Sequence, residues 1–176
     1  MMMHCVGTQS KDDNPRALSS DELLLRLEVD DFNARYANVL DQGNLLDWPK
    51  FFSKEPFYKI ASRENFSGNF PIGIMYCDSK AMLEDRVTSI VTSMEFSPRI
   101  VTHFISGHQL SDVAPASLAV RSNFLLVENM IDQKPSILMV GQYYDRFVRE
   151  DGVLLLKERI CVYDSILIQT SIIFPV

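Results

Sequence analysis

The feature that most constrains the fold of this chain is a pair of long β-prone arms between Gly141 and Asp164. An Asp-Gly pair, Asp151 and Gly152, separates the arms and predicts a hairpin, because both central positions of the favoured turn need a positive φ. Alternation on the second arm places Leu154, Leu156, Ile160 and Val162 on one face and Leu155, Arg159, Cys161 and Tyr163 on the other. Such a hairpin is unstable alone, so the rest of the chain must supply more strands or a helix.

The composition suits a single soluble domain. The 176 residues are 47% hydrophobic, which is enough for a sizeable core. The net charge of −6 argues against nucleic acid as a partner, because phosphate binding needs a basic patch. No apolar run approaches the roughly 18–20 residues of a membrane span, and the first residues lack the pattern of a signal peptide. We therefore expect a cytoplasmic protein that does not contact membranes.

Two amphipathic helices are predicted in the first half of the chain. Ser19 and Glu22 have the spacing of a capping box, which marks a helix start, and Gly43 can close that helix. The apolar face of this helix consists of Leu25, Val29, Phe32, Tyr36 and Val39. The other helix starts at Asp78 or Ser79 and places Leu83, Val87, Ile90 and Met94 on one face.

Shorter elements are expected between these two helices. Asp47 looks like the cap of a short helix that has Pro49 in its first turn and runs through Phe52. The remaining segments are a short strand over Pro56–Ser62, a polar loop over Arg63–Phe70, and the ambiguous stretch Pro71–Cys77.

Four β-prone stretches dominate the second half. They are Arg99–Leu110, Ser117–Glu128, Ser136–Arg149 and Val153–Ile173, divided by turn-rich segments. Short connections favour antiparallel neighbours, and helices followed by a meander indicate the α+β class. A curved antiparallel sheet wrapped around the N-terminal helices would form a cone. We expect residues 19–176 to form this single domain, with the polar residues 1–18 disordered or loosely packed.

The sequence offers no recognisable metal site. Its three cysteines, Cys5, Cys77 and Cys161, form no Cys-x-x-Cys or Cys-x-His motif, which argues against a disulfide framework and an iron–sulfur cluster. A mononuclear iron needs two histidines and a carboxylate. His103 and His108 are five residues apart on a predicted strand, so they should point to opposite faces unless a bulge intervenes. We expect no metal in this chain.

Acid–base chemistry is an open alternative. A cone-shaped α+β fold can enclose a pocket at its open end, as small isomerases and dehydratases do. His103 with Asp145 or Asp31 would then act as base and orienting group. The simpler interpretation is a buried or interface histidine with one hydrogen-bond partner, because nothing fixes a second catalytic group beside it.

Several arginines on predicted helices and strands indicate ion pairs. Arg in or near a sheet is usually paired with a carboxylate. The arginines are Arg86, Arg99, Arg146 and Arg159, and the candidate partners are Asp85, Asp145 and Glu158. These pairs lie either within the subunit or between subunits.

Other apolar residues are also candidates for contact between subunits. Trp48 is either a core anchor or an interface hot spot. The apolar tail, residues 166–176, is either a central strand or docks on another subunit. Our candidates for interface residues are Trp48, Arg86, Arg99, His103, Tyr143, Asp145 and Arg159.

An ordered set of motifs resembles a known family. The motifs are Tyr36…Leu40-Asp41 with Trp48-Pro49-x-Phe51-Phe52, Tyr58 with Arg63-Glu64-Asn65, Asp78-Ser79-x-x-Met82-Leu83-x-Asp85-Arg86, Arg99-x-x-x-His103, Ser122-x-Phe124, Gly141-x-Tyr143-x-Asp145 and Leu156-Lys157-x-Arg159. From about Phe32 to Val176 their order resembles the small (beta) subunits of Rieske-type aromatic-ring-hydroxylating oxygenases. Asn65-Phe66 and the segment from Cys161 to Pro175 are most similar to small subunits acting on aromatic carboxylates, as in salicylate hydroxylases and terephthalate dioxygenases.

The resemblance implies a cystatin-like or NTF2-like cone in an α3β3 hexamer, with a trimeric stem of small subunits. It implies that the Rieske [2Fe-2S] cluster and the mononuclear Fe(II) belong to the large subunit, and that NADH supplies electrons through separate components. This chain would carry no cofactor and no catalytic residue. It would be an assembly subunit of an enzyme that hydroxylates a carboxylate of the salicylate, terephthalate or benzoate type. The alternative is a stand-alone isomerase or dehydratase with His103 as its acid–base group.

Overall fold

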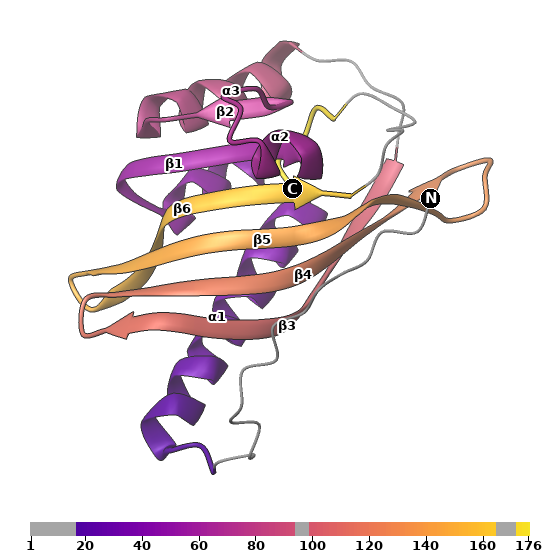
Figure 1. Ribbon diagram of the computed structural model, residues 1–176. Coiled ribbons are helices and arrows are strands. Elements are labelled where there is room, and N and C mark those ends of the chain that lie inside the picture. The colour runs from indigo at the N-terminus through magenta and orange to yellow at the C-terminus, as the bar shows by residue number, and fades with distance from the viewer. Residues whose placement is uncertain (1–16, 94–98, 165–171) are drawn as a thin grey trace.

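A curved sheet with helices packed against it forms the fold, in a computed structural model that describes residues 17–93, 99–164 and 172–176. The strands of this part are β1 (Phe52–Ser62), β2 (Met75–Cys77), β3 (Arg99–Ala114), β4 (Ser117–Met130), β5 (Ser136–Glu150) and β6 (Val153–Tyr163). Their order is β2-β1-β6-β5-β4-β3 (Figure 1). The meander from β3 to β6 is antiparallel, as predicted, and helices precede it, which confirms the α+β class.

One strand pairing differs from the predicted antiparallel sheet. β1 runs parallel to β6, with Tyr58 beside Arg159. About half of the chain separates these strands, so no tight turn fixes their relative direction. β1 also begins at Phe52 rather than at Pro56. The register shifts between Phe52 and Phe57, and Pro56, which has no N–H, lies within this irregularity.

The β5–β6 hairpin turns at Asp151 and Gly152, as predicted. Their φ angles are 52° and 81°, which a two-residue hairpin turn requires. The predicted alternation along β6 holds only up to Leu156, which is buried. A register shift then adds one residue to β6. As a result Arg159 and Cys161 point to the buried face on which Leu156 lies. A bulge of this kind leaves no clear signal in the pattern of apolar residues.

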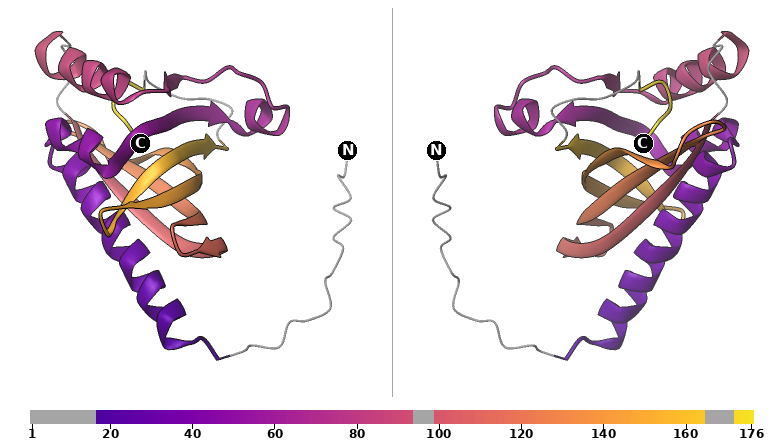
Figure 2. Two further views of the ribbon diagram at one scale, coloured as in Figure 1. Left: turned by 90° about the vertical axis from the view of Figure 1, so that its left-hand side faces the viewer. Right: turned by 90° about the vertical axis from the view of Figure 1, so that its right-hand side faces the viewer.

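The helix α1 (Ser20–Asp41) confirms the capping prediction. The hydroxyl of Ser19 accepts the backbone N–H of Glu22 at 3.2 Å, and Glu22 Oε2 accepts the N–H of Ser19 at 2.8 Å. Figures 1 and 2 show α1 crossing one face of the sheet. Its residues Val29, Phe32 and Tyr36 are buried there.

The other helices differ in part from the prediction. The short helix η1 (Leu45–Phe51) starts after Asn44, not at Asp47. α2 (Arg63–Ser67) replaces the predicted loop, because the hydroxyl of Ser62 accepts the N–H of Asn65 and caps it. α3 (Lys80–Ser93) starts as predicted and buries Leu83, Val87 and Ile90. Met94 lies outside the described residues, as do residues 1–16. No helix in the described ranges is long and apolar enough to cross a membrane.

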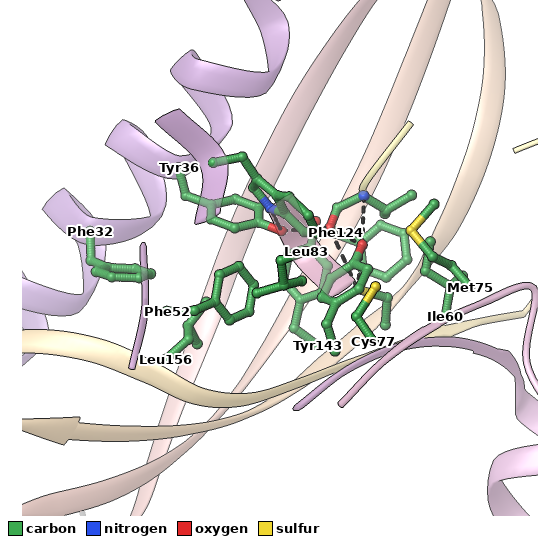
Figure 3. Packing of buried hydrophobic residues seen from close by; sticks show 14 of the residues in the cluster. Phe32, Tyr36, Phe52, Ile60, Met75, Cys77, Leu83, Phe124, Tyr143 and Leu156 are labelled. Atoms are coloured by element: carbon green, nitrogen blue, oxygen red, sulfur yellow. Dashed lines mark hydrogen bonds between the residues drawn. The ribbon is translucent and has the colours of Figure 1, made fainter. Parts of the chain in front are cut away.

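The core fills the space between the sheet, α1 and α3. Figure 3 shows Tyr36 from α1, Phe52 from β1, Leu83 from α3 and Tyr143 from β5 among the packed side chains of this core. Aromatic rings meet edge to face, as where Phe32 contacts Phe147 with centroids 4.9 Å apart.

The segment of residues 172–176 packs on this core. It forms no strand, and Val176 is 2% exposed. The expectation of a strand running to Ile173 is therefore wrong at its end, where the tail docks on its own chain. Residues 165–171 lie outside the described residues.

Candidate functional site

A buried ion pair joins the two arms of the β5–β6 hairpin. Arg159 Nε donates to Asp145 Oδ1 at 2.9 Å, and Arg159 Nη2 donates to Asp145 Oδ2 at 2.8 Å. Neither side chain has exposed surface. Arg159 Nη2 also donates to Asn33 Oδ1 on α1 at 2.7 Å. The pair confirms the expectation that Asp145 is a partner for an arginine of the sheet, and it ties the hairpin to the helix.

Two tyrosine rings enclose the guanidinium of Arg159. The ring centroids of Tyr36 and Tyr143 each lie 4.2 Å from Arg159 Cζ, a cation–π arrangement that gains strength where water is excluded. Burial is the largest single influence on Arg159 and opposes its charge, but the carboxylate of Asp145 and its hydrogen bonds, together with Tyr36 and Tyr143, hold the pKa of Arg159 well above its ordinary value. Arg159 is therefore a permanently charged internal anchor.

Hydrogen bonds extend from these rings to Val176. Trp48 Nε1 donates to Tyr36 Oη at 2.9 Å, and Tyr36 Oη donates to the backbone oxygen of Val176 at 3.1 Å. Tyr58 Oη donates to the same oxygen at 3.1 Å and accepts the N–H of Val176 at 2.8 Å. Burial raises the pKa of both tyrosines, so both hydroxyls remain protonated donors. We call the following set the buried polar cluster: Asn33, Tyr36, Trp48, Tyr58, Tyr143, Asp145 and Arg159.

This cluster removes four residues from the interface candidates. They are Trp48, Tyr143, Asp145 and Arg159, which are 0–2% exposed in the chain by itself. A side chain without exposed surface cannot contact a partner subunit. The sequence could not separate the two cases, because an Arg on a strand looks the same whether its carboxylate lies in its own chain or in another.

Two histidines on β3 bind carboxylates of α1. His103 Nδ1 lies 2.6 Å from Asp41 Oδ1, and the backbone N–H of His103 donates to Asp41 Oδ2 at 3.1 Å. His108 Nε2 lies 2.8 Å from Asp30 Oδ1, and His108 Nδ1 lies 2.6 Å from Ser122 Oγ. Both histidines therefore fix the position of α1 on the sheet.

A bulge in β3 explains why both histidines face α1. The register shifts between Ser106 and Gln109, and Gly107 has a φ of 68°, which suits glycine. The shift reverses the alternation, so His108 returns to the face of His103. We expected the two side chains to diverge unless a bulge intervened. The bulge is present, and both side chains lie on the same face.

The partners that the acid–base alternative gave His103 are engaged elsewhere. Asp145 binds Arg159, and Asp31 binds Arg35 at 2.8 Å on the exposed side of α1. The carboxylate that orients His103 is Asp41, which is not among the predicted partners. Its position at the end of α1, directly after the predicted apolar face, is a signal only once the packing of β3 on α1 is known.

A cavity of about 320 Å³ lies beside His103. Its wall is mostly apolar and includes Leu40, Leu45, Ile90, Val101, Leu126 and Leu138, together with residues 172–176. Its charged or titratable lining residues are Asp41, Arg99 and His103. The cavity therefore adjoins the His103–Asp41 pair but not the buried ion pair of the hairpin.

The remaining interface candidates differ in exposure. Arg99 pairs with Glu128 at 2.8 Å, and 11% of each side chain is exposed. Arg86 on α3 is half-buried, and its Nε has no hydrogen-bond partner among the described residues. The side chain of His103 is 3% exposed and borders the cavity. Arg86 and Arg99 thus stay open as interface residues.

Possible metal ligands do not gather in the described part of the chain. No three side chains of the His, Cys, Asp and Glu types come together there. His103 and His108 each approach a different aspartate.

Comparison with known proteins places this architecture in a family. Residues 35–170 match a family model described as the ring hydroxylating beta subunit. The chain belongs to the ring-hydroxylating beta subunits. The match spans most of the folded part and includes the hairpin ion pair, the two histidines of β3 and the last third of α1.

Individual relatives agree with the family. The anthranilate 1,2-dioxygenase small subunit of Burkholderia cepacia is 29% identical over 142 residues, which cover 81% of this chain and 88% of that protein. Subunit beta 1 of the terminal oxygenase component of terephthalate 1,2-dioxygenase from Comamonas is 26% identical over 153 residues, covering 87% and 99%.

Solved structures show the same fold. A beta subunit from Novosphingobium aromaticivorans, assigned to an aromatic-ring-hydroxylating dioxygenase, superposes with a TM-score of 0.76 at 31% identity, covering 82% of this chain and 92% of that one. A protein of the same organism assigned to the scytalone dehydratases gives a TM-score of 0.64 at 19% identity, covering 81% and 86%. The second likeness shows the fold alone. Together they confirm the predicted NTF2-like cone.

Proposed function

We propose that this chain is the non-catalytic beta subunit of an aromatic-ring-hydroxylating oxygenase and that it holds catalytic large subunits in register. The observation that carries this function is the family match over residues 35–170, supported by 31% identity to a beta subunit of the same fold. The buried polar cluster fits such a role, because its charged members anchor the hairpin internally and none of them is open to a substrate.

The outer face of the sheet offers a surface for assembly. Phe104 on β3, Leu125 on β4 and Val140 on β5 are neighbours in register across three strands. They lie on the face opposite α1, because the adjacent residue His103 points to α1. Phe104 is 55% and Val140 is 40% exposed. We call these three residues the outer apolar row. An exposed apolar row across three strands suits an apolar contact with another subunit, because stable interfaces resemble a protein core.

The redox centres belong to the large subunit in this proposal. The described residues bring no set of metal ligands together, whereas an iron–sulfur cluster needs four ligands and a mononuclear iron needs three. The Rieske [2Fe-2S] cluster and the Fe(II) then lie in the partner, and NADH supplies electrons through separate components. The contribution of this chain is geometric, since it fixes the distance between redox centres on neighbouring large subunits.

The stoichiometry, the compartment and the substrate class rest on the resemblance and on the relatives. We infer an α3β3 hexamer in the cytoplasm, with three copies of this chain in a trimeric stem. The relatives include subunits of anthranilate and terephthalate dioxygenases, whose substrates are aromatic carboxylates. The substrate class proposed here is accordingly an aromatic carboxylate of the salicylate, terephthalate or benzoate type.

Reconstitution tests the proposed function. The large subunit is purified with and without this chain, and product formation from salicylate, terephthalate and benzoate is measured with the electron-transfer components present. We expect turnover of at least one carboxylate only when this chain is present. Equal turnover in its absence would contradict the proposal.

A further inference from the structure

The cavity beside His103 has the size of a small-ligand site. Its volume of about 320 Å³ lies at the lower end of the range for ligand pockets. A cavity of roughly 150 Å³ already accepts benzene, so a single substituted ring fits. The apolar wall supplied by α1, α3, β3, β4 and β5 favours a compound that is mostly hydrocarbon.

Two buried polar atoms of residues that line this cavity, Arg99 Nε and His103 Nε2, lack a hydrogen-bond partner among the described residues. The side chain of His103 is only 3% exposed, and its Nε2 has no hydrogen-bond partner among the described residues. Such atoms are rare, because a buried polar group that leaves water and finds no partner costs free energy. A ligand that offers a hydrogen bond to Nε2 would recover that cost.

The contacts of His103 define what Nε2 can bind. A carboxylate only accepts hydrogen bonds, so the 2.6 Å contact with Asp41 places the proton of the neutral ring on Nδ1. The backbone N–H of His103 donates to the same carboxylate and holds it in place. In this tautomer Nε2 is an acceptor, and it calls for a donor such as a hydroxyl group.

We propose that this cavity binds a small hydroxylated ring compound, of the phenol class, whose O–H donates to His103 Nε2. Asp41 acts as a positioning residue that fixes the tautomer and the orientation of the imidazole. The site does not depend on the large subunit or on the oxygenase reaction. Failure of ligand binding would therefore leave the proposed function unaffected, and failure of the proposed function would leave the site unaffected.

The chain contains its own control for this site. His108 lies on the same face of β3 and also binds a carboxylate of α1, but both of its ring nitrogens have partners, Asp30 and Ser122. His108 does not line the cavity. A substitution at His108 therefore perturbs the packing of β3 on α1 in the same way as one at His103, without removing a ligand contact.

The test is titration of the full chain, labelled with 15N-histidine, with phenol and with toluene, in which a methyl group replaces the hydroxyl. We expect phenol to shift the Nε2 resonance of His103 and not that of His108, and toluene to bind about tenfold more weakly. His103→Asn keeps a donor for Asp41 but lacks Nε2, and it should reduce phenol affinity about tenfold. His108→Asn should leave that affinity unchanged. Leu138→Phe, which keeps both histidines and fills the cavity from β5, should abolish binding.

Several outcomes would overturn the proposal. Equal affinity for phenol and toluene would show that Nε2 makes no bond to the ligand, and unchanged binding by Leu138→Phe would place the ligand elsewhere. The same applies if no phenol binds at millimolar concentration to the folded wild-type chain. Arg99 also lines the cavity, so benzoate is titrated in parallel. Binding of benzoate but not of phenol would replace the hydroxylated ring by an anion and refute the assigned ligand class.

Discussion

Asp145 on β5 and Arg159 on β6 lie directly opposite each other and form an ion pair with two hydrogen bonds and no exposed surface. The rings of Tyr36 and Tyr143 cover the guanidinium, and Asn33 takes one further hydrogen bond. This pair therefore acts inside the subunit, where it fixes the hairpin against α1. Contact between subunits has to come from other residues.

Breaking this pair should unfold the chain rather than weaken assembly alone. Arg159→Met leaves the carboxylate of Asp145 buried without its partner, and such losses cost about 3–5 kcal/mol of stability. The free energy of unfolding in urea measures the effect. The double variant Arg159→Met/Asp145→Leu removes both charges and should be less destabilised than Arg159→Met. A single variant within about 0.5 kcal/mol of wild type would contradict this account of the pair.

The outer apolar row should matter for assembly and little for folding. Phe104→Asp places a charge at a position that is 55% exposed, so we expect the unfolding free energy to change by less than about 1 kcal/mol. Loss of an interface anchor should weaken association with the large subunit roughly 30-fold or more. Ile131→Asp, at an 81% exposed position after β4, is the matched control and should associate normally. Equal association of the two variants would exclude the row as a contact.

The hydroxyl of Tyr58 should be needed to hold Val176. Tyr58→Phe removes the donor and acceptor that bind the backbone of Val176, and it leaves these buried groups short of partners. We expect a loss of about 1–3 kcal/mol in unfolding free energy. Tyr76→Phe on β2 is the control, because that side chain is 44% exposed and its hydroxyl bonds only weakly to Asp78 at 3.3 Å. Similar stabilities for both variants would show that the tether is unimportant.

Stability should fall in alkaline solution. Burial raises the pKa of Cys161 to about 12, from an ordinary value of 9.0, and it also raises the pKa of Tyr58 and Tyr143. A group whose pKa is raised by folding contributes stability that is complete below its unfolded pKa and is lost as the pH rises toward the folded value. The unfolding free energy should therefore be level from pH 7 to 8.5 and fall above pH 9, by at most about 1.4 kcal/mol per pH unit for each group.

Cys161→Ala provides the control for this pH dependence. Removing one titrating group should make the decline between pH 9 and 10 shallower, with no change of slope near pH 7. Urea unfolding at a series of pH values measures both slopes. Stability that is independent of pH up to 10.5 in the wild-type chain would argue against these buried groups being protonated in the folded state.

Much of the fold could be predicted because local signals and packing agree. Three features depend only on residues that are close together in the sequence. They are the capping box of Ser19 and Glu22, the Asp151-Gly152 turn and the apolar face of α1. The bulge in β6 and the bulge near Gly107 in β3 could not be predicted. One added residue in β6 turns Arg159 inward, and the shift near Gly107 in β3 brings His108 to the face of His103. Alternation alone gives no position for such a shift.

The site was harder to predict than the fold, for a physical reason. The turn fixes the hairpin register only as far as Phe147 opposite Leu156, and Asp145 lies opposite Arg159 because the bulge then adds one residue to β6. The pairing of His103 with Asp41 joins residues 62 positions apart and depends on how α1 crosses the sheet. The parallel contact of β1 with β6 likewise joins distant segments. No short-range pattern reports such contacts.

The native mass and iron content of this chain, expressed alone and together with the large subunit, test the central claim most directly. The assembly role predicts an iron-free protein when the chain is alone, and an iron-containing complex with equal numbers of both subunits when they are combined. A monomer or dimer that never joins the large subunit would contradict it.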